Sequence, residues 1–234
     1  MRIIAGRFRR RQLLANPGLT TRPITDFVKE SLFTRIEERI TGLRVADIFS
    51  GTGTIGLEAL SRGAASVVFL EKDVKAIELL KRNVASLGEE AQAACLCWNA
   101  DIFKCSFRPK GDSAKFVPFD WMFFDPPFVM VEKLSPDSEL FRVLKQLARE
   151  DVSSPDARLV LRTPEEAAFV MPEVWEQEHH WHFSHMEIFI YRKAKPPEPA
   201  VLDEQPTSAT EPLDGTALTS PEVETPLATP EADA

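Results

Sequence analysis

The stretch Asp47-Ile48-Phe49-Ser50-Gly51-Thr52-Gly53-Thr54-Ile55-Gly56 decides the fold of this 234-residue chain. Its glycines have the spacing G-x-G-x-x-G, and they follow residues 43–49, which have the apolar composition of a buried strand. Residues 54–61 after the glycines are predicted to form a helix. A strand, a glycine turn and a helix in this order are typical of nucleotide-binding α/β sheets.

Strand-like and helix-like segments alternate on the C-terminal side of this stretch. Predicted strands are 66–71, 93–98, 119–124 and 158–162, and predicted helices are 25–40, 73–87 and 137–149. Alternation of this kind favours a mostly parallel sheet with helices on both faces. Residues 179–183 and 186–192 are predicted to close the sheet as an antiparallel pair. Thr163-Pro164-Glu165-Glu166 has the pattern of a capping box and predicts a short helix.

Charge is distributed unevenly along the chain. The net charge is −8, but residues 196–234 alone hold nine acidic residues, eight prolines and no Lys or Arg. That composition predicts a disordered tail, either dispensable or able to bind a partner. Residues 1–42 carry an excess of basic side chains and are expected to form a hairpin-like arm, residues 2–14 with Gly6 near its turn, and one helix. Residues 43–195 are expected to form the α/β domain.

Several classes of protein are disfavoured by the composition. No run of 18 apolar residues occurs, so no membrane span is expected, and the N-terminus lacks the apolar stretch of a secretion signal. The cysteines Cys95, Cys97 and Cys105 form no C-x-x-C pair, which favours free thiols in the cytoplasm. The histidines between 179 and 185 lack a carboxylate or thiolate at ligand spacing, so no metal site is predicted. Nothing in the sequence demands more than a monomer.

Two cofactors compete for the glycine turn. The spacing of the glycines, with Glu71 following the second strand, fits a dinucleotide site in an NAD(P) oxidoreductase. Asp47 argues against this, because a carboxylate before the turn would repel a pyrophosphate. S-adenosylmethionine has no phosphate, and Asp47 can attract its ammonium group. Gly51 and Gly53 would let the backbone approach the cofactor, and Glu71 could accept hydrogen bonds from both ribose hydroxyls.

The loops after the next strands complete the predicted cofactor site. Asp101 follows the third strand and could accept the adenine amine, while Ile102 could pack against the adenine ring. Phe49 and Lys72 flank the glycine turn and Glu71, and we include them among the predicted cofactor-binding residues.

The motif Asp125-Pro126-Pro127-Phe128 follows an apolar strand and indicates the reaction class. An aryl amine is a poor nucleophile because its lone pair is delocalised into the ring. The carboxylate of Asp125 and the backbone carbonyl of Pro126 can each accept one amine hydrogen, which localises that lone pair. Pro127 helps to hold the backbone rigid, and Phe128 can stack on a base that has left its helix. Positive side chains that could contact RNA phosphates are Arg7, Arg9, Arg10, Arg11, Arg22 and Lys29.

At these residues the chain resembles the RsmD family, the bacterial 16S rRNA guanine-N2 methyltransferases. The resemblance extends over about residues 1–192 and rests on residues 2–6, 22–33, 47–63 and 125–128. It implies a class I S-adenosylmethionine-dependent (Rossmann-like) methyltransferase fold, in which a mostly parallel seven-stranded sheet has one antiparallel strand. It also implies cofactor contacts at Asp47, Gly51, Gly53, Glu71 and Asp101 and catalysis at Asp125 with Phe128. The dense arginines at 9–11, Ile24 in place of the family's usual threonine, the weak match after Phe128 and the acidic tail depart from the family pattern.

We therefore hypothesise that the chain methylates the N2 amine of a guanine in 16S rRNA, within the small ribosomal subunit or its assembly intermediate. Residues 1–42 would be the RNA-binding extension and residues 43–195 the catalytic domain. The same motif also serves adenine-N6 and protein-glutamine methylation. The basic arm disfavours a protein substrate but does not distinguish the two bases. An adenine-N6 nucleic-acid methyltransferase and a non-catalytic RNA-binding assembly factor remain the alternatives.

Overall fold

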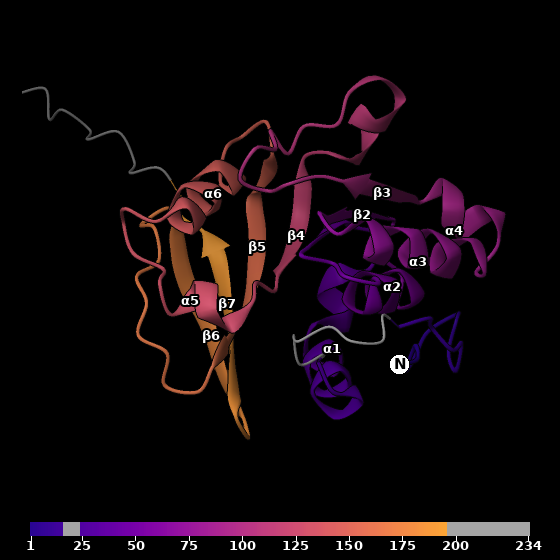
Figure 1. Ribbon diagram of the computed structural model, residues 1–234, viewed down its shortest axis with the longest axis horizontal. Coiled ribbons are helices and arrows are strands. Elements are labelled where there is room, and N and C mark those ends of the chain that lie inside the picture. Colours follow the sequence, from indigo (N-terminus) through magenta and orange to yellow (C-terminus); the bar gives the residue numbers. More distant parts are fainter. Residues whose placement is uncertain (16–23, 196–234) are drawn as a thin grey trace, which may run out of the picture. The chain divides into compact units, whose positions relative to one another are not determined.

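A seven-stranded sheet with the order β3-β2-β1-β4-β5-β7-β6 forms the centre of the fold (Figure 1). The computed structural model describes residues 1–15 and 24–195. Neighbouring strands are parallel except at β7, which runs antiparallel to β5 and β6. The predicted sheet with one antiparallel strand is thus confirmed. The strands are β1 (Arg44–Ile48), β2 (Ser66–Glu71), β3 (Cys95–Asn99), β4 (Phe119–Phe124), β5 (Ser153–Pro164), β6 (Trp175–Phe183) and β7 (Met186–Lys193).

Helices cover both faces of the sheet, and each face has its own apolar core. On one face, side chains of α1, α2 and α3 pack against alternate residues of the central strands, such as Val45 and Phe123. On the other face, α6 and η1 pack against the residues between them, such as Ala46 and Phe124. The helices are α1 (Asp26–Ile40), α2 (Thr54–Ser61), α3 (Val74–Ala85), α4 (Glu89–Ala93), η1 (Gly111–Phe116), α5 (Phe128–Val131) and α6 (Glu139–Leu147).

The first helix, predicted from residue 25, begins at Asp26 directly after a capping threonine. The hydroxyl of Thr25 accepts a hydrogen bond from the backbone N–H of Val28, and Asp26 lies in the first turn, where a carboxylate favours the helix dipole. Val28, Leu32 and Ile36, which are spaced by four residues, are all buried against the sheet. This spacing therefore orients α1 with one apolar face inward.

The C-terminal half differs from the prediction most clearly at residue 163, and β5 and β6 also begin earlier than predicted. The helix predicted at residue 163 is wrong, because β5 continues through Thr163 and Pro164, which pair with Glu187 and Met186 of β7. The hydroxyl of Thr163 donates to the Pro164 carbonyl instead of capping a helix. Pairing with a neighbouring strand, which local sequence does not report, has overridden the capping pattern.

The N-terminal arm is a hairpin-like turn docked on α2. Arg2 and Gln12 form an antiparallel bridge, as expected for a hairpin, and Gly6 lies in the turn with a φ of 76°. A side chain at position 6 could not be accommodated, because a Cβ atom there would lie 1.8 Å from the carbonyl oxygen of Ser61 at the end of α2. The backbone of the arm is thus held directly against the helix that follows the glycine turn.

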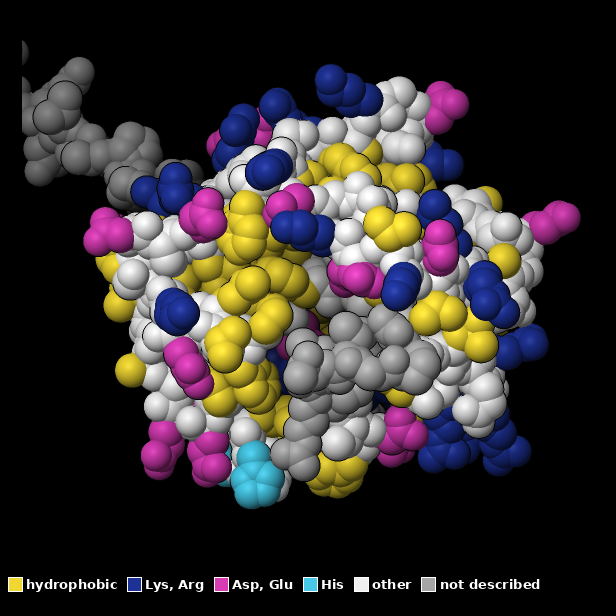
Figure 2. All heavy atoms as spheres, in the orientation of Figure 1, with side chains coloured by type: hydrophobic (Ala, Val, Ile, Leu, Met, Phe, Trp, Pro, Cys, Tyr) yellow, Lys and Arg dark blue, Asp and Glu magenta, His cyan; other side chains and the backbone are white. Residues whose placement is uncertain are grey.

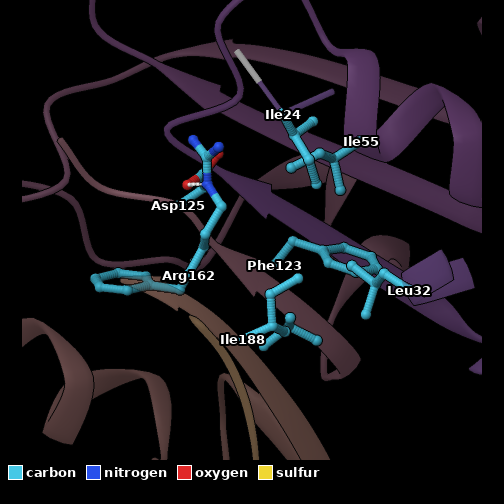
Figure 3. A pocket seen from close by; sticks show the side chains of 9 residues that line it. Ile24, Leu32, Ile55, Phe123, Asp125, Arg162 and Ile188 are labelled. Carbon is cyan, nitrogen blue, oxygen red and sulfur yellow. Dashed lines mark hydrogen bonds and ion pairs between the residues drawn. The ribbon is translucent and has the colours of Figure 1, made fainter. Parts of the chain in front are cut away.

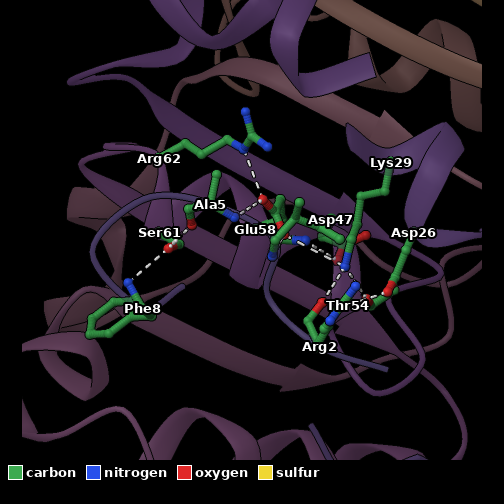
Figure 4. A network of polar contacts seen from close by, with 12 residues as sticks. Arg2, Ala5, Phe8, Asp26, Lys29, Asp47, Thr54, Glu58, Ser61 and Arg62 are labelled. Atoms are coloured by element: carbon green, nitrogen blue, oxygen red, sulfur yellow. Dashed lines mark hydrogen bonds and ion pairs between the residues drawn. The ribbon is translucent and has the colours of Figure 1, made fainter. Parts of the chain in front are cut away.

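A buried polar network joins the arm to α1 and α2 (Figure 4). Both oxygens of Glu58 accept backbone N–H groups of the arm, from Ile4 at 2.7 Å and from Ala5 at 3.1 Å. The same carboxylate bonds Arg62 at 2.8 Å and faces the ammonium of Lys29 at 3.6 Å. All three charged side chains are at most 3% exposed, so the network is desolvated and depends on its mutual pairing.

Two predictions concern residues that the structure does not describe. The acidic tail, residues 196–234, and Arg22 both lie outside the described ranges. Within the described ranges, no helix is long and apolar enough to cross a membrane.

Candidate active site

The glycine turn lies between the end of β1 and the start of α2. Gly51 and Gly53 have φ values of 54° and 86°, in the left-handed region that favours glycine. Gly56 is helical, but a Cβ atom there would lie 2.4 Å from the ring of Phe69 and 3.0 Å from the side chain of Asp47. The first two glycines therefore shape the turn, while the third lets α2 approach the sheet closely.

Asp47 is buried beneath this turn. Its side chain is 1% exposed and accepts the backbone N–H of Gly56 at 2.8 Å. Burial raises the pKa of Asp47 from 3.8 to about 7; the bond from Gly56 opposes the rise, and the nearby carboxylates of Asp125 and Glu71 add to it. A cationic group bound here would restore the charged form, which suits the ammonium group predicted for this position.

Glu71 fixes the turn from the neighbouring strand. One of its oxygens accepts the N–H of Gly51 at 2.8 Å, and the other accepts the N–H of Asp73 at 2.7 Å. Each carboxylate oxygen can accept more than one hydrogen bond, so Glu71 retains capacity for ribose hydroxyls.

The remaining predicted cofactor residues border the same edge of the sheet. Asp101 accepts the N–H of Phe103 at 3.1 Å and pairs with Lys72 at 2.8 Å, and this pair lowers the pKa of Asp101. Ile102 beside it is buried. Phe49 has a φ of 64° and packs edge-on against Phe124 at a centroid distance of 5.5 Å.

Asp125 follows β4 and lies beside the glycine turn. Its backbone N–H donates to the carbonyl of Ile48, the last residue of β1, at 3.3 Å. The next residues turn sharply, since Pro127 caps the short helix α5, which begins at Phe128. The carboxylate of Asp125 therefore lies at the edge where β1 and β4 end, as the two motifs predict.

An arginine that the sequence did not single out faces this carboxylate (Figure 3). The Nε of Arg162, on β5, donates to Oδ1 of Asp125 at 2.7 Å. Burial raises the pKa of Asp125, and the charge and hydrogen bond of Arg162 oppose this. The guanidinium carbon of Arg162 also lies 5.3 Å from the ring centroid of Phe128. In the sequence, Arg162 directly follows the apolar residues 159–161 of a predicted strand. A charged residue at the end of a buried strand was the one sign that Arg162 could belong to the site.

Four of the predicted RNA-contacting arginines lie exposed on the N-terminal arm. Arg9, Arg10 and Arg11, which we call the arm arginines, are exposed at the turn of the arm, and Arg7 is exposed in a pair with Glu90. Figure 2 shows Lys and Arg side chains gathered around this part of the molecule, at its lower right.

The prediction that Lys29 contacts RNA is wrong. Its side chain is 1% exposed, and its ammonium donates to the Arg2 carbonyl at 2.7 Å and to the Thr54 hydroxyl at 3.1 Å. Because Lys29 also faces Glu58, its charge is used inside the fold and not on the surface.

The histidines between 179 and 185 lie on and just after the edge strand β6. His180 and His182 face the carboxylates of Glu187 and Glu165 at 3.2 and 3.4 Å. In the described part of the chain, no group of three His, Cys, Asp or Glu side chains is placed to hold a metal ion.

Comparison with known proteins identifies the family. The model of the family described as conserved hypothetical protein 95 matches residues 1–192. Ribosomal RNA small subunit methyltransferase D of Haemophilus influenzae is 33% identical over 178 residues, which are 75% of this chain and 84% of that protein. This chain belongs to the RsmD family.

Other RsmD relatives and solved structures agree with this assignment. The protein of the same name from Escherichia coli K12 is 38% identical over 130 residues, 55% of this chain and 60% of that one. The structure of yhhF from Escherichia coli matches with a TM-score of 0.66 and 25% identity, covering 84% of this chain and 99% of that one. An RNA methyltransferase from Salinibacter ruber in complex with S-adenosyl-L-homocysteine shares the fold, with 16% identity and a TM-score of 0.54, over 78% of this chain and all of that one. The class I methyltransferase fold is therefore confirmed.

Proposed function

We propose that this RsmD family member transfers a methyl group from S-adenosylmethionine to the N2 amine of a guanine in 16S rRNA. The observation that carries the proposal is the Asp125 carboxylate, placed where β4 ends beside the glycine turn at the end of β1. The curated relatives named as small-subunit rRNA methyltransferases support rRNA methylation as the activity. We further propose that the chain acts as a cytoplasmic monomer on the small subunit or its assembly intermediate.

The chain offers a site that fits S-adenosylmethionine, which when bound supplies an electrophilic methyl group on a sulfonium. We assign Asp47 to the ammonium group, Glu71 to the ribose hydroxyls, and Asp101 with Ile102 to the adenine. Gly51 and Gly53 form the turn, Phe49 precedes it, and Lys72 follows Glu71 and pairs with Asp101. The fit rests on the donor set, because Glu71 and Asp47 accept the backbone N–H groups of Gly51 and Gly56 at the two ends of the glycine segment, and the space beside Gly51 is open. A pyrophosphate would meet the buried Asp47 unfavourably.

Asp125 and Pro126 would activate the target amine. Each can accept one amine hydrogen, which draws the nitrogen toward tetrahedral geometry and exposes its lone pair to the methyl group. Methyl transfer would form a nitrogen–carbon bond at the expense of the donor's sulfur–carbon bond and leave the nitrogen positively charged. The nitrogen would then lose a proton, which the carboxylate of Asp125 can accept and pass to solvent. Pro127 would hold this backbone rigid, and Phe128 would stack on the extruded base.

The arm arginines would contact phosphates and position the RNA without reading its sequence. With Arg7, they form an exposed basic group on an arm that Glu58 holds against α2. Because α2 begins at the glycine turn, the RNA-binding surface and the cofactor site would share one rigid support. Arg22, outside the described residues, completes the proposed set.

The decisive test is transfer of labelled methyl from S-adenosylmethionine to small ribosomal subunits that lack the modification, with the product nucleoside identified by mass spectrometry. We expect N2-methylguanosine at one site. N6-methyladenosine would refute the choice of base, and no transfer to subunits or free RNA despite cofactor binding would refute the substrate class. Asp125→Ala should abolish turnover with nearly unchanged cofactor affinity. Asp120→Ala, at the other end of β4, is the matched control and should retain turnover.

A further inference from the structure

Arg162 is built into the sheet beside the proposed amine acceptor. Strands β4 and β5 pair with Phe124 opposite Leu161, so Arg162 and Asp125 each follow a paired position on adjacent strands. Their side chains are only 10% and 16% exposed. The Nε–Oδ1 distance of 2.7 Å is that of a charge-assisted hydrogen bond. The pair is thus fixed by strand register and by burial.

We infer that Arg162 is a positioning residue for methyl transfer: it keeps Asp125 as a carboxylate, fixes the plane of that carboxylate through Oδ1, and holds the ring of Phe128. This inference rests on the proposed role of Asp125 as acceptor of an amine hydrogen. With Oδ1 bonded to Arg162, Oδ2 is the oxygen presented to the target amine. One guanidinium would in this way orient both the acceptor and the stacking ring.

The charge of Arg162 matters because the surroundings of Asp125 oppose ionisation. The pocket beside Asp125 is lined by apolar side chains from α1, α2 and β7, namely Leu32, Ile55 and Ile188. Burial in such surroundings raises the pKa of a carboxyl group. The carboxylates of Asp125 and Glu71 in turn raise the pKa of the neighbouring Asp47 on β1, so negative charges already crowd this edge of the sheet. A protonated Asp125 would have a donor where the amine hydrogen needs an acceptor.

Arg158 provides a matched control on the same strand. It lies four positions earlier on β5, on the same face, and pairs with Glu178 at 2.9 Å. Losing Arg158 therefore removes a partly buried ion pair from β5 without touching Asp125. A variant at this position reports the purely structural effect of removing an arginine from the strand.

The first experiment follows the Asp125 carboxyl carbon by ¹³C NMR during a pH titration of the cofactor-free full chain. Asp125→Asn and Asp47→Asn identify the two carboxyl signals. We expect Arg162→Met to move the Asp125 midpoint to higher pH, Arg162→Lys to move it less, and Arg158→Met to leave it unchanged. If Arg162→Met does not fold, Arg162→Gln serves with the same expectation. An unmoved midpoint in the uncharged variant would overturn the inference.

The second experiment measures single-turnover methyl transfer against pH at saturating cofactor. Wild-type rates should fall at low pH as Asp125 becomes protonated. Arg162→Met should move this fall to higher pH and lose about 10²-fold in rate near pH 6, since small misplacements of reacting groups cost this much. The loss should narrow as pH rises, and Arg162→Lys should recover part of the rate. A loss equal at all pH values would overturn the claim that Arg162 keeps Asp125 charged, because misplacement alone lowers the rate by the same factor at every pH. A wild type without transfer would refute the proposed function, while the NMR titration still decides whether Arg162 holds Asp125 charged.

Discussion

Replacing Asp47 by asparagine should stabilise the cofactor-free protein while weakening cofactor binding. Asp47 is buried, and its pKa rises from 3.8 to about 7 on folding. The folded state therefore binds the Asp47 proton more tightly than the unfolded chain does. Binding of this proton contributes to the free energy of unfolding. The contribution is fully present below about pH 4, where the unfolded chain is also protonated, and it is lost as the pH rises to about 7. Asparagine is nearly isosteric, stays neutral, and can still accept the N–H of Gly56.

The size of the effect follows from that pKa. A rise from 3.8 to about 7, at about 1.4 kcal/mol per pH unit, makes ionised Asp47 cost about 4 kcal/mol of unfolding free energy above neutral pH. The advantage of Asp47→Asn over the wild type should therefore grow by about 3 kcal/mol between about pH 5 and pH 8. Urea unfolding of both proteins at several pH values measures this difference.

Asp120 provides a control of opposite sign for the same substitution. Partial burial would raise the pKa of Asp120, but its hydrogen bonds and charge interaction with Arg44 together lower it. Asp120→Asn should therefore destabilise the protein at neutral pH and less so in acid. A stability difference for Asp47→Asn that does not change with pH, or cofactor affinity equal to the wild type by calorimetry, would refute the reasoning about Asp47.

Three further predictions concern the N-terminal arm. Replacing the three arm arginines by alanine should raise KM for RNA and flatten its dependence on salt, and unchanged kinetics across salt concentrations would exclude them from the RNA site. Gly6→Ala should cost about 2–5 kcal/mol of unfolding free energy, because it adds a backbone clash to an unfavourable φ. Gly42→Ala, with the same φ of 76° and open space, should cost only about 1–2 kcal/mol, and equal losses in urea unfolding would contradict this account. Glu58→Gln should cost about 3–5 kcal/mol, because it leaves Lys29 buried without a carboxylate partner and Arg62 with Glu37 alone, and a loss below about 1 kcal/mol would show that the network relaxes.

The sequence predicts best where a structure is determined by nearby residues. The glycine turn and α2 are predicted residue for residue, because Gly51 and Gly53 occupy left-handed backbone positions and the helix starts at the next residue. Asp125 could likewise be placed beside Asp47, since the ends of parallel strands meet at one edge of a sheet.

Predictions fail where a distant partner decides the outcome. The sequence suggests that Lys29 is a surface cation. In the structure it is buried, because it faces the buried carboxylate of Glu58, 29 residues further along the chain. Pro164 continues β5 because Met186 of β7 pairs with it. Arg162 gains its importance only when the register of β4 and β5 brings it to Asp125. In each case the information lies in strand order and packing and not in local pattern.

The backbone contacts of Glu58 have a consequence for how the N-terminus can be handled. The amides of Ile4 and Ala5, although so close to the chain end, donate to a fully buried carboxylate. Opening of the arm would remove two of the groups that compensate this buried carboxylate and leave Lys29 and Arg62 as its partners, so these amides should exchange their hydrogens with deuterium slowly. Deleting residues 1–5 would therefore remove a structural support of α2, the helix that follows the glycine turn.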